Sequence, residues 1–181
     1  LFWSLYLVAG CPAAQERIAA EAAPLDLAPG GAAAALPQLV YTRAAVEEAL
    51  RLYPPAFSIV RQARRGDVAG IPIPPGAVVL IVPWVLHRHR RLWRDPDAFD
   101  PGRFLPGAAP PERFAYLPFG AGPRSCIGAQ FALTETVLVV AHLIRSFRIA
   151  RGDSRPVLPR AIVTLQPDHP PPFRLERRAG A

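Results

Sequence analysis

Residues 119–128 read FGAGPRSCIG and stand directly before an apolar segment, residues 129–147, that predicts a helix. Gly120 and Gly122 allow a tight loop whose backbone N–H groups point inward. The start of the following helix favours negative charge, and Arg124 adds a cation two residues before Cys126. Both effects favour the thiolate of Cys126, which is the form that binds metals. A lone cysteine is more often a small buried apolar residue, but this combination of neighbours indicates a metal ligand.

Composition limits the classes of protein to which the chain can belong. It has 181 residues, a formal net charge of +7, 51% apolar residues and 23 prolines. The apolar content argues against a wholly disordered chain, and the prolines exclude long uninterrupted helices over much of its length. Two cysteines, Cys11 and Cys126, are too few for the disulfide framework of a small secreted protein. Residues 1–8 are apolar but too short to cross a bilayer, and no basic segment precedes them, so we expect a cytoplasmic protein.

Hydrophobic periodicity predicts a mainly α fold with a small β component. Helices are expected over residues 1–8, 12–23, 43–53 and 129–147, and strands over residues 57–60, 76–82, 161–165 and 173–176. Thr42 is the expected N-cap of the third helix, and residues 24–37 are an expected connector. Residues 83–125 are expected to be irregular but packed. The last helix is apolar on almost every side, which is typical of a buried helix. No internal repeat or domain boundary is visible, so residues 1–181 are expected to form a single partial domain.

Two sequence signatures resemble those of one known family. Residues 119–128 match, position by position, the haem-binding loop F-G-x-G-x-R-x-C-x-G of the cytochrome P450 family. Upstream, residues 48–51 (EALR) resemble the E-x-x-R motif of the family's K helix. The spacing of three places Glu48 and Arg51 on one helical face.

A third signature departs from the family pattern. The family has a P-E-R-F motif after a D-P-x-x-F segment, and here residues 95–104 read DPDAFDPGRF, with Gly102 at the glutamate position. A literal PERF at residues 111–114 stands too close to the cysteine loop to be that motif. The resemblance therefore implies that Arg103 joins Glu48 and Arg51 in the family's structural lock of charged residues.

The resemblance covers essentially the whole chain. It implies the C-terminal part of the cytochrome P450 fold, from the end of the I helix through the J and K helices, small sheet, meander and haem-binding loop to the L helix. Complete members are much longer, so we expect a C-terminal fragment. The oxygen-activating residues of the I helix are absent from it, and no catalytic residue is assigned.

The family's cofactor is haem b, and the resemblance makes Cys126 the axial ligand of its iron. A thiolate ligand pushes electron density onto iron and favours O–O cleavage. Arginines suit the haem propionates because they pair with carboxylates through two hydrogen bonds. The expected haem contacts are Arg61, His87, Phe119, Gly120, Gly122, Arg124 and Gly128. Arg64 and Arg65 lie close enough to be alternatives to Arg61, and His87 is equally explained as a partly buried loop histidine.

The implied activity is that of a haem-thiolate monooxygenase. Such an enzyme inserts one oxygen atom of O2 into an organic, lipophilic substrate, with electrons from NAD(P)H delivered by a ferredoxin or flavoprotein reductase. The candidate substrate contacts are Ala56, Phe57, Ser58, Ile162 and Val163, which would equally suit an ordinary core. Two alternatives are an inactive remnant that binds haem weakly or not at all, and a basic binding module whose cysteine is incidental.

Residues 87–94 read HRHRRLWR and form the densest cationic cluster of the sequence. The simplest interpretation is a solvated surface without a partner. A second is a docking face for an acidic electron-transfer partner, whose approach such charge would steer. Nucleic-acid binding ranks last, because no nucleic-acid motif accompanies the charge, and we expect no nucleic-acid partner.

Overall fold

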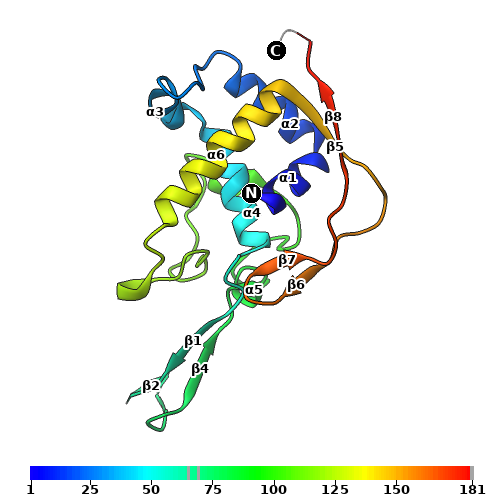
Figure 1. Cartoon of the computed structure of the whole chain (residues 1–181). Helices are drawn as coiled ribbons and strands as arrows, with labels where there is room; N and C mark the ends of the chain where they lie inside the picture. Colours follow the sequence, from blue (N-terminus) through cyan, green and yellow to red (C-terminus); the bar gives the residue numbers. More distant parts are fainter. Residues whose placement is uncertain (65, 69, 180–181) are drawn as a thin grey trace.

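The computed structural model describes residues 1–64, 66–68 and 70–179. A small group of helices forms the body, a β-hairpin extends from one end of it, and the C-terminal strands run along its side (Figure 1). The helical elements are α1 (Phe2–Ala9), α2 (Pro12–Ala22), α3 (Ala32–Ala35), η1 (Leu36–Gln38), α4 (Val40–Leu52), α5 (Pro83–Leu86), η2 (Pro101–Phe104), η3 (Gly122–Arg124) and α6 (Ala129–Ser146). The strands are β1 (Ile59–Gln62), β2 (Asp67–Val68), β3 (Ile71–Pro72), β4 (Val78–Ile81), β5 (Phe147–Arg151), β6 (Pro159–Ala161), β7 (Leu165–Pro167) and β8 (Phe173–Arg177). A mainly α fold with a small β component is thus confirmed.

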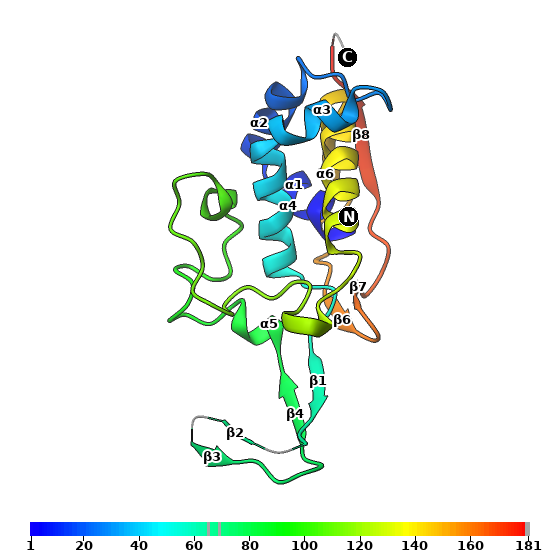
Figure 2. The same cartoon turned by 90° about the vertical axis from the view of Figure 1, so that its left-hand side faces the viewer.

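The core lies between α2, α4 and α6, and Figure 2 shows α4 and α6 side by side. Its fully buried members include Ile18, Val46, Val137, Val140 and Ile144. On α6 the buried positions recur at helical spacing, so they form one stripe along the helix. Burial of this stripe, rather than helix propensity, is what stabilises the helix in the fold.

The last helix, whose sequence is typical of a buried helix, is only partly covered in the described part of the chain. Phe131, in its first turn, is 73% exposed, and His142 is also exposed. Only the stripe that faces α2 and α4 is covered by residues that the structure describes. Apolar residues on all sides of a helix indicate that it can be buried, but burial requires neighbouring elements that pack against each side.

The strands form antiparallel pairs: β1 with β4, β2 with β3, β5 with β8, and β6 with β7. The continuous strand expected over residues 161–165 is wrong, because Ala161 pairs with Leu165 and the three residues between them make a hairpin turn. The chain also turns directly from α6 into β5 at Phe147, where the sequence predicted the end of a helix.

The start of α4 differs from the predicted start because a residue of another helix binds it. Thr42 is a buried residue inside the helix rather than its N-cap. Its hydroxyl donates to Glu21 Oε2 at 2.7 Å, and the backbone N–H groups of Tyr41 and Thr42 donate to the same carboxylate. A carboxylate from α2 therefore satisfies two of the free N–H groups at the start of α4. In the expected connector, the alanine run Ala32–Ala35 forms the short helix α3. No helix in the described part of the chain is long and apolar enough to cross a membrane.

Candidate functional site

A buried ion pair lies on the inner face of α4. Glu48 and Arg51 are both 0% exposed, and the guanidinium binds the carboxylate through two bonds, from Nε to Oε2 at 2.7 Å and from Nη2 to Oε1 at 2.8 Å. Arg103, in η2, adds a third charge by donating from Nε to Glu48 Oε1 at 3.3 Å. The structure therefore brings together the three residues that the resemblance groups as a charged lock.

Arg51 also holds an irregular part of the backbone. Its Nη1 donates to the carbonyls of His87 at 2.6 Å and Pro96 at 2.7 Å, and its Nη2 donates to the carbonyl of Ala98 at 3.0 Å. The N–H of Asp100 donates to Glu48 Oε1 at 2.9 Å. These bonds fix the segment between α5 and η2 against α4.

His87 lies at the end of α5 and is fully buried. The N–H of Leu117 donates to Nε2 at 2.8 Å, so Nε2 is an acceptor and the proton sits on Nδ1, which donates to the carbonyl of Arg51 at 3.0 Å. Burial is the main cause that lowers the pKa of the imidazole to about 4. Both ring nitrogens of His87 are hydrogen-bonded to backbone groups, so the ring has no N–H left to donate to a propionate. Its position is that of a buried loop histidine, the second of the two interpretations of the sequence.

The cysteine loop closes on itself through backbone bonds. Gly120 and Gly122 adopt φ of +73° and +76°, the left-handed region that glycine enters without strain. The N–H of Cys126 donates to the carbonyl of Phe119 at 2.9 Å, which closes the loop. Cys126 itself is exposed and unpaired, and Gly128, the N-cap of α6, follows two residues later. The thiol thus stands free at the start of a long helix.

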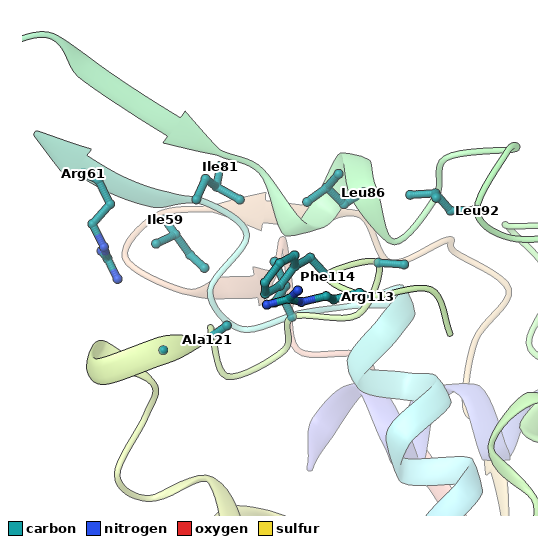
Figure 3. Close-up of a pocket in the computed structure, with 11 residues that line it drawn as sticks. Ile59, Arg61, Ile81, Leu86, Leu92, Arg113, Phe114 and Ala121 are labelled. Carbon is teal, nitrogen blue, oxygen red and sulfur yellow. The ribbon is translucent and has the colours of Figure 1, made fainter. Parts of the chain in front are cut away.

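An apolar pocket of about 560 Å³ lies beside this loop. Figure 3 shows Ile59 and Arg61 entering it from β1, Phe114 and Arg113 from the segment before the loop, and Ala121 from the loop itself. Its lining residues are Ile59, Arg61, Ile81, Leu86, Leu92, Arg113, Phe114, Ala115, Leu117, Ala121 and Gly122. The sequence had assigned no functional role to Ile59, Arg113 or Phe114. Phe114 has φ of +67°, a backbone feature that the PERF letters do not reveal.

The two expected propionate arginines occupy different settings. Arg61 lines the pocket, and its Nη1 donates to the carbonyl of Val60 at 2.8 Å. Arg124 is exposed in η3, in the cysteine loop. Of the alternatives to Arg61, Arg64 is exposed and Arg65 lies outside the described residues.

The candidate substrate residues come from two segments that touch. The N–H of Leu165 donates to the carbonyl of Pro55 at 3.0 Å, which joins the β6–β7 hairpin to the residues after α4. Ala56, Phe57 and Ser58 are half-buried there, whereas Ile162 and Val163 in the hairpin turn are exposed.

In the arginine-rich segment, Arg88 packs its guanidinium 3.5 Å from the centre of the Trp84 ring and pairs with Asp97. The neighbouring His89, Arg90 and Arg91 are exposed. A cationic surface with a partly aromatic base therefore lies next to α5.

The residues around the loop fit a haem. The exposed Cys126 thiol could serve as a metal ligand, the apolar walls of the neighbouring pocket would suit a porphyrin ring, and Arg61 in the pocket lining and Arg124 in the loop would offer cations to its carboxylates. The chemistry of this donor set is therefore consistent with the cofactor that the loop motif implies.

Comparison with known proteins agrees with the motifs. The cytochrome P450 family model matches residues 1–172. The chain is 39% identical over 170 residues to cyclooctatin synthase of Streptomyces melanosporofaciens. The aligned region is 91% of this chain and 36% of that protein. The chain is 36% identical over 180 residues to human cytochrome P450 4A11 (97% and 34%) and 41% identical over 147 residues to thromboxane-A synthase of Sus scrofa (79% and 28%). The chain thus spans about a third of the length of these curated relatives. It belongs to the cytochrome P450 family.

Proposed function

We propose that this chain provides the thiolate side of the haem site in a cytochrome P450 monooxygenase, with Cys126 as the axial ligand. The observation that carries the proposal is the free, exposed Cys126 thiol in a closed glycine loop beside an apolar pocket. Haem with a thiolate ligand supplies O–O cleavage and oxygen-transfer chemistry when it is bound.

The residues of this chain would contribute binding and orientation. The bond from the Cys126 N–H to the Phe119 carbonyl would fix the loop, so that the sulfur is presented in one direction. Arg61 and Arg124 would pair with the propionates. Ala115 and Leu117, which are buried and line the pocket, would limit the access of water to that side of the site.

The candidate substrate contacts of this chain favour a lipophilic substrate, because Ala56, Phe57, Ser58, Ile162 and Val163 are apolar or small. They are separate from the lining of the pocket beside the cysteine loop, whose walls are assigned to the porphyrin ring. The relatives named above carry different product names, so we propose a substrate class and no individual compound. Residues 56–58 and 162–163 are the proposed substrate contacts of this chain.

The electrons would come from NAD(P)H through a ferredoxin or a flavoprotein reductase. We assign the docking face to the exposed cations beside α5, Arg90 and Arg91, because an acidic partner would be steered toward them. A cytoplasmic location belongs to the same proposal, since the free thiols of Cys11 and Cys126 suit a reducing compartment.

The decisive experiment is optical. The protein expressed from its complete gene should give the strongly red-shifted CO band of a reduced thiolate-ligated haem. Cys126→Ser should abolish that band, whereas Cys11→Ser should keep it, because Cys11 precedes α2 on another part of the molecule. A thiolate-type band in Cys126→Ser would refute the ligand assignment. Absence of the band in the wild-type protein would favour the inactive alternative.

A further inference from the structure

A side chain outside the cysteine loop reaches its backbone. Among the residues that the structure describes, His87 is the one side chain that hydrogen-bonds to the backbone of residues 117–128, through the N–H of Leu117 at 2.8 Å. The other backbone bonds of this stretch either stay within it, from Gly120 to Leu117, from Ser125 to Gly122 and from Cys126 to Phe119, or join it to the start of α6, from Ala129 to Cys126 and from Ala132 to Gly128. The loop therefore has a single side-chain tether to the rest of the fold.

The other end of the tether is the buried ion pair. His87 Nδ1–H donates to the carbonyl of Arg51, and the guanidinium of Arg51 donates back to the carbonyl of His87 at 2.6 Å. These two residues are thus bound to each other twice. Because Arg51 is also fixed to Glu48 by two bonds, the position of the imidazole is set by α4.

We propose that His87 is a positioning residue for the cysteine loop, which it ties through Leu117 to the ion pair on α4. This inference rests on the proposed function, since it concerns how the Cys126 thiolate is held. The path runs from the imidazole to the Leu117 N–H, then through the turn in which the Leu117 carbonyl accepts the Gly120 N–H at 3.2 Å. Phe119 lies inside that turn, and its carbonyl is the acceptor of the Cys126 N–H.

The exposure of the loop explains why such a tether would matter. Residues 121–127 are all exposed, so apolar packing contributes little to their placement. Leu117, by contrast, is 7% exposed, and its N–H would be buried without a partner if the imidazole were removed. An unpaired buried N–H is costly, so the start of the loop would move to find water or another acceptor.

Two substitutions separate the two ends of the tether. In His87→Asn the side-chain amide lies where Nδ1 lies, so it can still bond to the Arg51 carbonyl but cannot reach Leu117. In His87→Gln the terminal amide lies where Nε2 lies, so its oxygen can accept the Leu117 N–H. Gln15 shows that a glutamine can serve backbone groups in this fold, since it donates to the Ile149 carbonyl and accepts the Ile149 N–H. His142→Phe, at an exposed position of α6, is the control.

Hydrogen exchange of the Leu117 and Cys126 amides tests the inference without relying on haem. We expect both amides to exchange about tenfold faster in His87→Asn than in the wild type, and at nearly wild-type rates in His87→Gln and His142→Phe. Faster exchange at Leu117 with unchanged exchange at Cys126 would overturn the inference, because the effect of His87 would then stop at Leu117 and not reach Cys126. Equal rates at Cys126 in the Asn and Gln variants would overturn it as well.

The CO spectrum gives the second readout. His87→Asn should lose part of the thiolate-type band in favour of the thiol-type band, and His87→Gln should keep the thiolate-type band near its wild-type intensity. A general loss of stability, by contrast, would lower the intensity of the thiolate-type band in both variants alike. An unchanged band in His87→Asn would refute the positioning role and leave the proposed function standing. A wild-type protein without the band would refute the proposed function, and the exchange rates would still decide whether the tether exists.

Discussion

Replacing Arg51 with alanine should remove most of the stability of the fold. The substitution deletes five donated hydrogen bonds, two to Glu48 and three to backbone carbonyls. Removing one partner of a buried ion pair costs about 3–5 kcal/mol because the other charge is left uncompensated. Part of that charge stays paired here, since Arg103 and the N–H of Asp100 still donate to Glu48. The three carbonyls lose their donor, at roughly 1 kcal/mol each if they stay buried.

These contributions overlap, so we expect about 4–5 kcal/mol rather than their sum. A typical domain has about 5–15 kcal/mol in total, so Arg51→Ala should unfold largely or lose its haem. The assay is denaturant unfolding of the protein expressed from its complete gene, together with its haem content after gel filtration. The matched control is Arg113→Ala, which removes an arginine that is exposed and contacts the Phe114 ring. We expect the control to change the free energy of unfolding by about 0.5 kcal/mol or less.

Two results would refute this reasoning. A folded Arg51→Ala protein with the wild-type denaturation midpoint and a full complement of haem would show that the buried pair is not needed. A collapse of Arg113→Ala would show that the literal PERF segment, rather than Arg103, carries the structural role.

Three further predictions concern pH, association and charge. The pKa of His87 is lowered from 6.5 to about 4 in the fold, so the unfolded chain takes up the proton first and stability falls as the pH drops from 6.5 toward 4. The loss should be about 2 kcal/mol at pH 5 relative to pH 8, and His87→Gln should show a correspondingly flatter dependence of its denaturation midpoint on pH. The 181-residue chain expressed by itself should associate and bind a hydrophobic dye, because Phe131 is 73% and Val78 is 71% exposed; a monodisperse monomer in light scattering would contradict this. Reversing the charges of Arg90 and Arg91 to glutamate should slow reduction by an acidic partner at low salt and weaken its dependence on ionic strength, and an unchanged rate would move the docking face elsewhere.

The features that the sequence revealed are those encoded within a few neighbouring residues. The cysteine loop needs its glycines, its arginine and its cysteine at fixed positions, so ten consecutive letters specify it. The stripe of α6 and the i, i+3 pair on α4 are likewise local, because helical geometry alone decides which residues share a face. Arg103 could be placed with Glu48 only through the family resemblance, since 55 positions separate them.

The features that sequence reasoning missed depend on tertiary partners. Thr42 looked like an N-cap because its residue type suits one, yet Glu21 of α2 satisfies the start of α4 and draws Thr42 inside the helix. Residues 162–164 are β-branched and favour a strand, but the pairing of Ala161 with Leu165 places them in a turn. For His87 the sequence left two interpretations open, a haem contact and a partly buried loop histidine, and only the positions of the Arg51 carbonyl and the Leu117 N–H show where its ring is used.

The burial of Arg51 has a physical reason that an apolar substitute could not meet. A buried ion pair is often no better than well-packed apolar residues of the same volume, so its charge alone does not justify its place. The segment between α5 and η2, however, has no strand or helix partner for the carbonyls of His87, Pro96 and Ala98 in the described fold. A guanidinium carries five N–H donors in a fixed plane, so it can bind a carboxylate and still satisfy several carbonyls. A lysine has only three donors around a single atom and could not serve both groups at these positions, so Arg51→Lys should fail to restore the stability that Arg51→Ala loses. Recovery of the wild-type denaturation midpoint by lysine would show that charge, and not the shape of the donor set, is what the segment requires.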